Sequence, residues 1–141
     1  MKGFLIDTNV LSELRKGARA DVNVRRWFER VDERSIFLSV LVTGEIRRGI
    51  EAIRKRDLRA ATALERWLDN VMQAHSDRVL PVDAATADEW GRLDARGSLP
   101  VVDGLLAATA RVHDLTLVTR NVKDVVRTGI DVLDPFAPTA Q

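Results

Sequence analysis

The sequence predicts a single α/β domain with a central parallel sheet of four to five short strands and helices on both faces. Short apolar runs recur along the 141 residues, and longer segments with a helical spacing of apolar residues separate them. Short buried strands that alternate with helices are typical of parallel sheets, because the connection between parallel strands is usually a helix. The length is that of one domain with a core of its own.

Each expected strand is a short apolar run. The strands are expected at 4–6, 35–38, 79–82, 116–119 and, as an edge strand, 130–133. Pro81 cannot donate a backbone hydrogen bond, so the third strand should lie at a margin of the sheet.

The expected helices are the segments between these runs. They are 10–16, 21–31, 39–54, 58–74, 84–96, 100–113 and 122–127. The pattern is clearest where Val42, Ile46 and Ile50 recur at every fourth position. Thr8 or Asn9 is expected to cap the first helix, and Gly17 to end it.

Composition excludes several classes of protein. The formal net charge of +1 is too balanced for binding nucleic acid by bulk charge alone. The absence of cysteine removes disulfides, thiolate zinc sites and cysteine nucleophiles. No signal peptide or membrane span is visible, so we expect a cytoplasmic protein. The domain is expected to span 1–136, with a C-terminal tail at 137–141 and fraying from Pro135 onwards.

Four acidic residues are placed to meet at one edge of this sheet. Asp7 directly follows the first strand, Glu45 lies in the helix after the second, Asp103 opens a helix, and Asp124 lies five residues past Thr119. Each has an ordinary explanation of its own, as a helix cap, a helical ion pair or an acid in a first helical turn. Ligands of parallel α/β sheets bind beyond the carboxyl ends of the strands, which is where all four acids should lie.

Four carboxylates in one cleft repel one another, and their pKa values should be raised. A divalent cation relieves this repulsion, and oxygen ligands without cysteine suit Mg²⁺ or Mn²⁺ better than zinc. One or two such ions can activate water and stabilise a leaving oxygen in phosphodiester cleavage. The acids alone therefore indicate metal-dependent phosphoryl chemistry, without naming the polymer.

Five segments together resemble a known family. They are IDTNVLSEL, SVLVTGEIRRGIE, LPVDAATADEWGRL, LPVVDGLLAATARVHDLTLVTRNVKD and the closing VLDPF. From Phe4 to Phe136 the chain resembles PIN domains, specifically VapC- or FitB-type toxins of type II toxin–antitoxin modules. The resemblance implies an Mg²⁺- or Mn²⁺-dependent endoribonuclease toxin that cleaves RNA with metal-activated water. It also implies a homodimer and a small VapB-like antitoxin that inhibits it and contributes the DNA binding.

The resemblance also implies roles for individual residues. By position, Asp7, Glu45, Asp103 and Asp124 match the catalytic, metal-binding acids. The supporting polar residues of the family are matched by Thr8, Asn9, Thr119 and Asn121. Val125 is a departure, since similar proteins usually have Phe after the last acid, and either Asn121 or Asp124 could face the metal.

Other residues allow alternative interpretations. Arg47, Arg48 and Arg120 are candidates for binding the RNA backbone. His75 and His113 could form an acid–base pair in a metal-free ribonuclease, although the helix dipole also explains both. A catalytically silent PIN scaffold that acts through partner binding stays open. A receiver-type phospho-acceptor module would need paired acids after the first strand, where Thr8 and Asn9 stand instead.

Overall fold

The five strands form one parallel sheet, as the sequence predicts. The computed structural model describes residues 2–138. The strands are β1 (Phe4–Ile6), β2 (Ile36–Ser39), β3 (Val79–Leu80), β4 (Thr116–Val118) and β5 (Val132–Leu133). Their order across the sheet is β3-β2-β1-β4-β5, and every neighbouring pair is parallel. The predicted edge positions of the third and fifth strands are confirmed.

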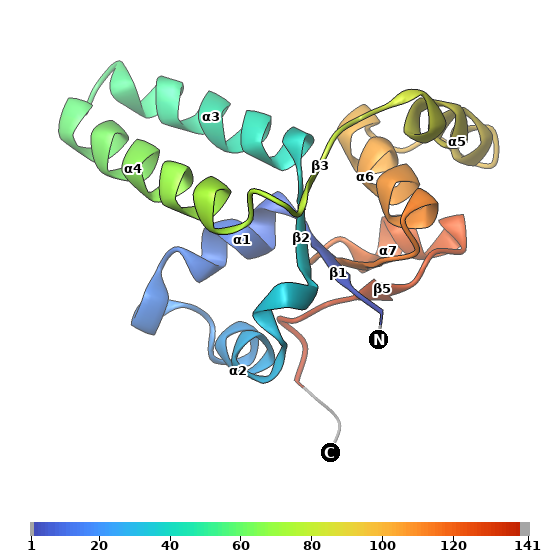
Figure 1. The fold of residues 1–141 in the computed structure, drawn as a ribbon, viewed down its shortest axis with the longest axis horizontal. Helices are drawn as coiled ribbons and strands as arrows, with labels where there is room; N and C mark the ends of the chain where they lie inside the picture. Colours follow the sequence, from blue (N-terminus) through green and yellow to red (C-terminus); the bar gives the residue numbers. More distant parts are fainter. Residues whose placement is uncertain (1, 139–141) are drawn as a thin grey trace.

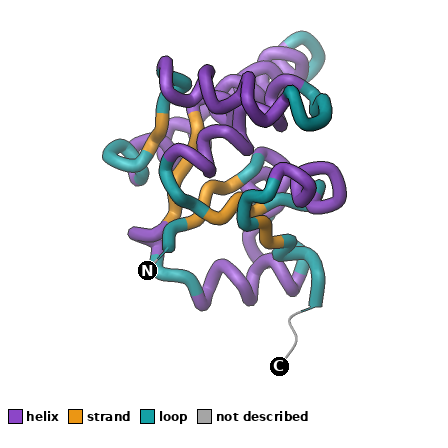
Figure 2. Tube along the Cα trace, turned by 90° about the vertical axis from the view of Figure 1, so that its right-hand side faces the viewer, coloured by secondary structure: helices purple, strands orange, loops and turns teal. Residues whose placement is uncertain are grey.

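Helices cover both faces of this sheet. They are α1 (Thr8–Leu14), α2 (Val22–Arg30), α3 (Val40–Arg54), α4 (Leu58–Ala74), α5 (Ala84–Asp94), α6 (Val101–Val112) and α7 (Val122–Val125). Figure 1 shows α1 to α4 on one side of the strands and α5 to α7 on the other. Figure 2, turned by 90°, shows the strands enclosed between helices. Right-handed crossovers explain the division, because the chain adds strands in one direction from β1 to β3 and in the other from β4 to β5.

The order in which strands are added to the sheet reverses between β1 and β4. Phe4 pairs with Ile36 of β2 on one side and with Thr116 of β4 on the other. The connection from β1 runs towards β2, whereas β4 arrives later on the opposite flank. A crevice opens beyond the carboxyl ends of two such strands, because the helices that follow them lie on opposite faces.

The core consists of the strands and the apolar faces of the helices. Leu5, Leu38 and Leu117 are fully buried in adjacent strands. The predicted stripe of α3 is confirmed, since Val42 and Ile50 are also fully buried. The sheet therefore fixes the positions of the residues that directly follow β1, β2 and β4.

The first helix begins earlier than the sequence predicts. Thr8 and Asn9 were expected to cap it, but both lie inside α1, and the cap is Asp7. The Asp7 carboxylate accepts a hydrogen bond from the Thr8 backbone N–H at 2.7 Å. Because Asp7 keeps the extended backbone of the strand, no loop residue separates β1 from α1. The turn from strand to helix is therefore made by Asp7 itself.

The expected fraying from Pro135 is also wrong. Pro135 is buried, and Phe136 packs against the core. The Asn23 side-chain amide of α2 donates to the Phe136 carbonyl at 2.9 Å. These contacts tie the chain down as far as Phe136; of the predicted tail, residues 139–141 lie outside the described part of the chain.

Smaller differences concern element ends. The third strand stops at Leu80, before Pro81, and the fourth stops at Val118. Ser39 belongs to β2 and caps α3, with its hydroxyl accepting from the Leu41 N–H at 3.0 Å. Within residues 2–138, no helix combines the length and the apolar character that a membrane crossing requires.

Candidate functional site

Asp7 directly follows β1, at the point where the strand order reverses between β1 and β4. Its side chain is only 6% exposed. Thr119 directly follows β4, and its hydroxyl donates to Asp7 Oδ2 at 2.7 Å. The Thr8 backbone N–H donates to the other oxygen, Oδ1, at 2.7 Å. The Asn9 amide lies 3.4 Å from Oδ2. Donors from both flanking segments thus hold this carboxylate in one orientation.

The environment of Asp7 acts on its pKa in two opposing ways. Burial raises the pKa, since it disfavours the ionised form, and the charge of Glu45 raises it further. The hydrogen bonds from Thr119 and from the Thr8 N–H lower it. The net result is a raised pKa. The hydrogen bonds therefore offset only part of the free energy that burying the ionised carboxylate costs.

Glu45 is tied to the first helix by a hydroxyl. It lies in the second turn of α3, which directly follows β2, and it is half-buried. The Thr8 hydroxyl donates to Glu45 Oε1 at 2.5 Å. Thr8 therefore contacts two acids, Asp7 through its N–H and Glu45 through its hydroxyl.

Asp103 joins the group from the opposite face of the sheet. It lies in the first turn of α6. Its pKa is raised first by burial and then by the charges of Asp7, Glu45 and Asp124. Among residues 2–138, no hydrogen bond to the Asp103 carboxylate lowers this pKa again. The charges of the other three predicted acids thus all act on Asp103, although the four acids come from four different helices or helix caps.

The two candidates for the fourth position are placed differently. Asp124 is exposed on α7, and its charge acts on Asp103. Asn121 is also exposed, and its backbone N–H donates to the Thr119 hydroxyl at 3.1 Å. Asn121 therefore supports Thr119 through its backbone. The electrostatic contact of Asp124 with Asp103 favours it as the fourth acid, and its role in metal binding stays a prediction.

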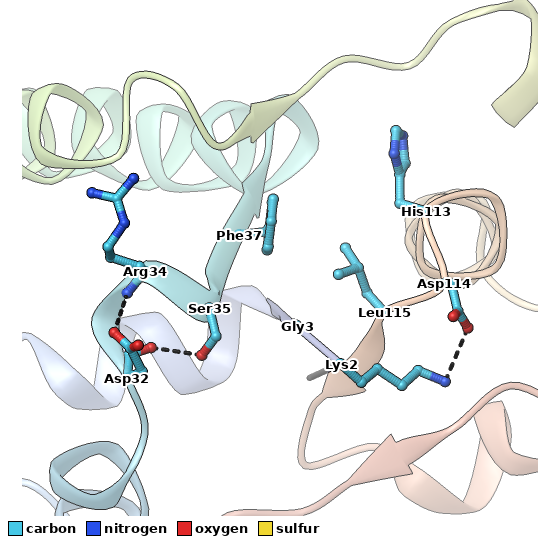
Figure 3. A pocket seen from close by; sticks show the side chains of 9 residues that line it. All are labelled: Lys2, Gly3, Asp32, Arg34, Ser35, Phe37, His113, Asp114 and Leu115. Atoms are coloured by element: carbon cyan, nitrogen blue, oxygen red, sulfur yellow. Dashed lines mark hydrogen bonds and ion pairs between the residues drawn. The ribbon is translucent and has the colours of Figure 1, made fainter.

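A large hollow lies at the amino ends of the strands, opposite the acids. Its volume is about 640 Å³, and Gly3, Ser35 and Leu115 in its wall directly precede β1, β2 and β4. Figure 3 shows Lys2 bridging to Asp114 across its floor, at 3.2 Å. His113 borders this hollow (Figure 3).

His75 lines a different cavity. That cavity is apolar, has a volume of about 180 Å³ and lies among α1, α2, α4 and the first two strands. His75 Nδ1 is 2.9 Å from the Val71 carbonyl of its own helix. Because the two histidines border separate hollows, the structure does not bring together the acid–base pair that a metal-free ribonuclease would need.

Comparison with known proteins agrees with this geometry. The PIN domain family pattern matches residues 4–128. The chain belongs to the PIN domain family. It is 31% identical over 140 residues to the VapC ribonuclease Y4jK of Sinorhizobium fredii, a match that covers 96% of this chain and 99% of that protein. It is 26% identical to the toxin FitB of Neisseria gonorrhoeae, covering 94% of this chain and 98% of FitB.

A solved structure shares the fold closely. The crystal structure of FitAcB from Neisseria gonorrhoeae superimposes on this PIN domain with a TM-score of 0.84 at 25% sequence identity. The match covers 94% of this chain and 98% of that one. The predicted resemblance to VapC- and FitB-type proteins is confirmed over nearly the whole chain.

The donor set of this PIN domain suits a hard divalent cation. All of its candidate ligands are carboxylate, hydroxyl or amide oxygens, the ligand type that Mg²⁺ and Mn²⁺ prefer. Within the described residues, no three acidic or histidine side chains are grouped tightly enough to hold an ion by themselves. Magnesium usually keeps several waters and uses only one or two carboxylates directly, so an ion bound here would be held partly through water.

The three candidate RNA-binding arginines differ in their surroundings. Arg47 forms ion pairs with Glu65 at 2.5 Å and with Glu51 at 3.4 Å, so it joins α3 to α4. Arg48 is exposed on the same helix. The guanidinium of Arg120 lies 4.3 Å from the centre of the Phe136 ring. The structure therefore assigns Arg47 a role in helix packing that the sequence did not predict.

Phe136 is the residue that the sequence analysis missed as part of the site. It lies 16 positions after Arg120 in the printed sequence, beyond β5. The only signal was the closing VLDPF segment, which carries the family resemblance. Neither helical nor strand periodicity could pair a C-terminal ring with a loop arginine.

Proposed function

We propose that this PIN domain is an Mg²⁺- or Mn²⁺-dependent endoribonuclease and the toxin of a type II toxin–antitoxin module. One observation supports the catalytic part: after burial, the charges of Asp7, Glu45 and Asp124 each raise the pKa of Asp103, so three of the predicted acids act on the fourth. The similarity to a VapC ribonuclease at 31% identity supports RNA as the substrate. The similarity to the toxin FitB supports the biological role.

The four acids would hold the cation, directly or through water. A divalent ion bound there would supply positive charge that activates water and stabilises the leaving oxygen of a phosphodiester. The repulsion that raises the pKa of Asp103 would favour such an ion, since the cation replaces like-charge contacts by attraction.

The chain's own residues would prepare this site before substrate binds. Thr119 and the Thr8 N–H fix both oxygens of Asp7, and the Thr8 hydroxyl fixes Glu45. Fixed carboxylates need little reorganisation when charge develops during the reaction. Neither histidine borders the acids, so within the described residues we assign no imidazole base.

The test is cleavage of a panel of structured and single-stranded RNAs by the purified protein, free of any partner. The reactions contain EDTA, Mg²⁺ or Mn²⁺, and the variants are Asp7→Asn, Asp103→Asn and, as a matched exposed control, Asp69→Asn on α4. We expect metal-dependent cutting that both site variants lose and the control keeps. Cutting that persists in EDTA would contradict metal dependence. An intact panel in every metal would favour the silent scaffold, which acts only through partners.

The toxin role predicts a protein partner. We expect a small VapB-like antitoxin to inhibit this chain and the chain itself to be a homodimer. Growth would be measured on expression of the chain alone and together with the product of the gene adjacent to its own. Growth arrest that the adjacent product relieves, and that Asp103→Asn does not cause, would support the role. Light scattering of the purified protein would test the dimer.

A further inference from the structure

Arg120 is an exposed cation held in place from one side. Its guanidinium lies 4.3 Å from the centre of the Phe136 ring, a distance typical of a cation–π contact. Within residues 2–138, no carboxylate lies within ion-pair distance of it. A cation–π contact does not need the N–H groups as donors to an oxygen, and within the described residues the guanidinium makes no such hydrogen bond. Arg120 is therefore ordered while its hydrogen-bonding capacity stays available.

The ring that supports Arg120 is itself fixed. The Asn23 amide of α2 donates to the Phe136 carbonyl at 2.9 Å, and the Phe136 N–H donates to Asp134 Oδ1 at 2.9 Å. Phe136 also packs against the core. A platform anchored at these points reduces the entropy that Arg120 would lose on binding a ligand.

The backbone of Arg120 is part of the acidic site. Its N–H donates to Asn9 Oδ1 at 3.3 Å, and the preceding residue, Thr119, holds Asp7. The pKa of Glu13 is lowered mainly by the Asp21 N–H and by Lys16, with a smaller contribution from the charge of Arg120. Glu13 lies one helical turn beyond Asn9 on α1. The charge of Arg120 therefore acts on Glu13 of α1, while its backbone contacts Asn9 beside Asp7.

We propose that Arg120, positioned by Phe136, binds a phosphate of single-stranded RNA that flanks the phosphate to be cleaved. The acids repel the RNA backbone, so a substrate needs a cation next to them for its neighbouring phosphates. Planar guanidinium donors match phosphate oxygens, and Arg120 is the candidate arginine that directly follows Thr119, the residue that holds Asp7. Arg47, in contrast, is already paired with two carboxylates. This inference rests on the proposed ribonuclease function and names a substrate contact for it.

The first test measures RNA binding without cleavage. A short, fluorescently labelled single-stranded RNA of mixed sequence is titrated in EDTA at several salt concentrations. Arg120→Ala should weaken binding about tenfold and reduce the slope of log K against log salt by about 0.7, the value for one phosphate contact on a single strand. Arg59→Ala is the matched control, because it removes one exposed arginine at the start of α4. Equal binding by the two variants would overturn the proposal.

The second test isolates the positioning role of Phe136. Phe136→Leu removes the aromatic face and keeps an apolar side chain, while Phe136→Tyr keeps the face. In a double-mutant cycle, Phe136→Leu should weaken RNA binding about threefold when Arg120 is present and leave it unchanged when Arg120 is alanine. Phe136→Tyr should bind as the unchanged protein does. A loss of the same size with and without Arg120 would mean that Phe136 acts only on stability, and would overturn its positioning role.

The two proposals fail in different ways. If the unchanged protein cuts RNA and Arg120→Ala raises KM while kcat stays the same, both hold. If the protein cuts RNA and Arg120→Ala alters neither KM nor RNA affinity, only the Arg120 contact is wrong. If the unchanged protein neither binds nor cuts RNA, the ribonuclease function fails and the contact fails with it.

Discussion

The Thr119 hydroxyl donates to Asp7 Oδ2 at 2.7 Å and so joins the ends of β1 and β4, the two strands between which the strand order reverses. Thr119 is fully buried, and its oxygen also accepts from the Asn121 N–H at 3.1 Å. One hydroxyl therefore connects the most buried acid of the site to the loop that carries Arg120 and Asn121.

Thr119→Val should damage both stability and activity. Valine keeps the shape but removes a hydrogen bond to the buried carboxylate of Asp7 and the acceptor for the Asn121 N–H. We expect a loss of about 1–3 kcal/mol in the free energy of unfolding and a marked drop in RNA cleavage. Urea denaturation and cleavage rates measure the two effects. Thr119→Ser keeps the hydroxyl and should retain most of both; an equal loss in the serine variant would point to packing instead.

Asp103→Asn should stabilise the metal-free protein while it removes cleavage. The Asp103 carboxylate is repelled by Asp7, Glu45 and Asp124, and an uncharged amide avoids this repulsion. At neutral pH in EDTA we expect the melting temperature to rise by about 2–5 °C. Calorimetry measures the shift, with Asp69→Asn as the exposed control. A lower melting temperature would show that the carboxylate makes a stabilising contact.

The same variant gives a prediction for pH. The pKa of Asp103 is raised above its usual 3.8 in the folded state, so on raising the pH the unfolded chain loses this proton first. The folded protein then binds more protons than the unfolded chain, and the free energy of unfolding falls as pH rises from 3.8 through the raised pKa. The advantage of Asp103→Asn should be absent below pH 3.8 and should grow above it. An advantage that does not change with pH would contradict this account.

Divalent cation should reverse that destabilisation. A ligand that binds only the folded state raises its stability by mass action, so Mg²⁺ or Mn²⁺ should raise the melting temperature of the unchanged protein. The rise should be smaller in Asp103→Asn, which has one candidate ligand fewer. Calorimetry with and without EDTA tests this independently of RNA cleavage. Equal shifts in the two proteins would place the binding of the ion elsewhere.

Thr8→Val should release Glu45 without removing an acid. The Thr8 hydroxyl donates to Glu45 Oε1 at 2.5 Å, whereas its N–H, which binds Asp7, is kept in the variant. We expect kcat to fall roughly tenfold with little change in KM, because a misplaced ligand affects the reaction more than substrate binding. Thr8→Ser should restore the rate. Unchanged kcat in Thr8→Val would show that Glu45 does not need this contact.

Much of the fold could be predicted, because it depends on local patterns. The spacing of Val42, Ile46 and Ile50 predicts the helix that became α3, and α4 has the predicted limits. The ends of elements were less predictable, since they depend on single hydrogen bonds. Asp7 caps α1 through its own side chain, which moved the start of the helix forward to Thr8. Phe136 looked like part of a frayed tail because its partners, Asn23 and Arg120, are distant in the sequence.

By itself, the sequence determined the class of the fold and named four candidate acids for the site. Alternating apolar runs and helical spacings specify which segments are strands and helices, and Asp7, Glu45, Asp103 and Asp124 stand out because each lies near the end of one such element. Only the tertiary structure decided the strand order β3-β2-β1-β4-β5, which makes β1 and β4 neighbours. That arrangement brings Thr119 to Asp7, lets the charges of the other three acids act on Asp103 and sets Arg120 over the Phe136 ring. Contacts of this kind depend on packing between distant segments, which local periodicity does not encode.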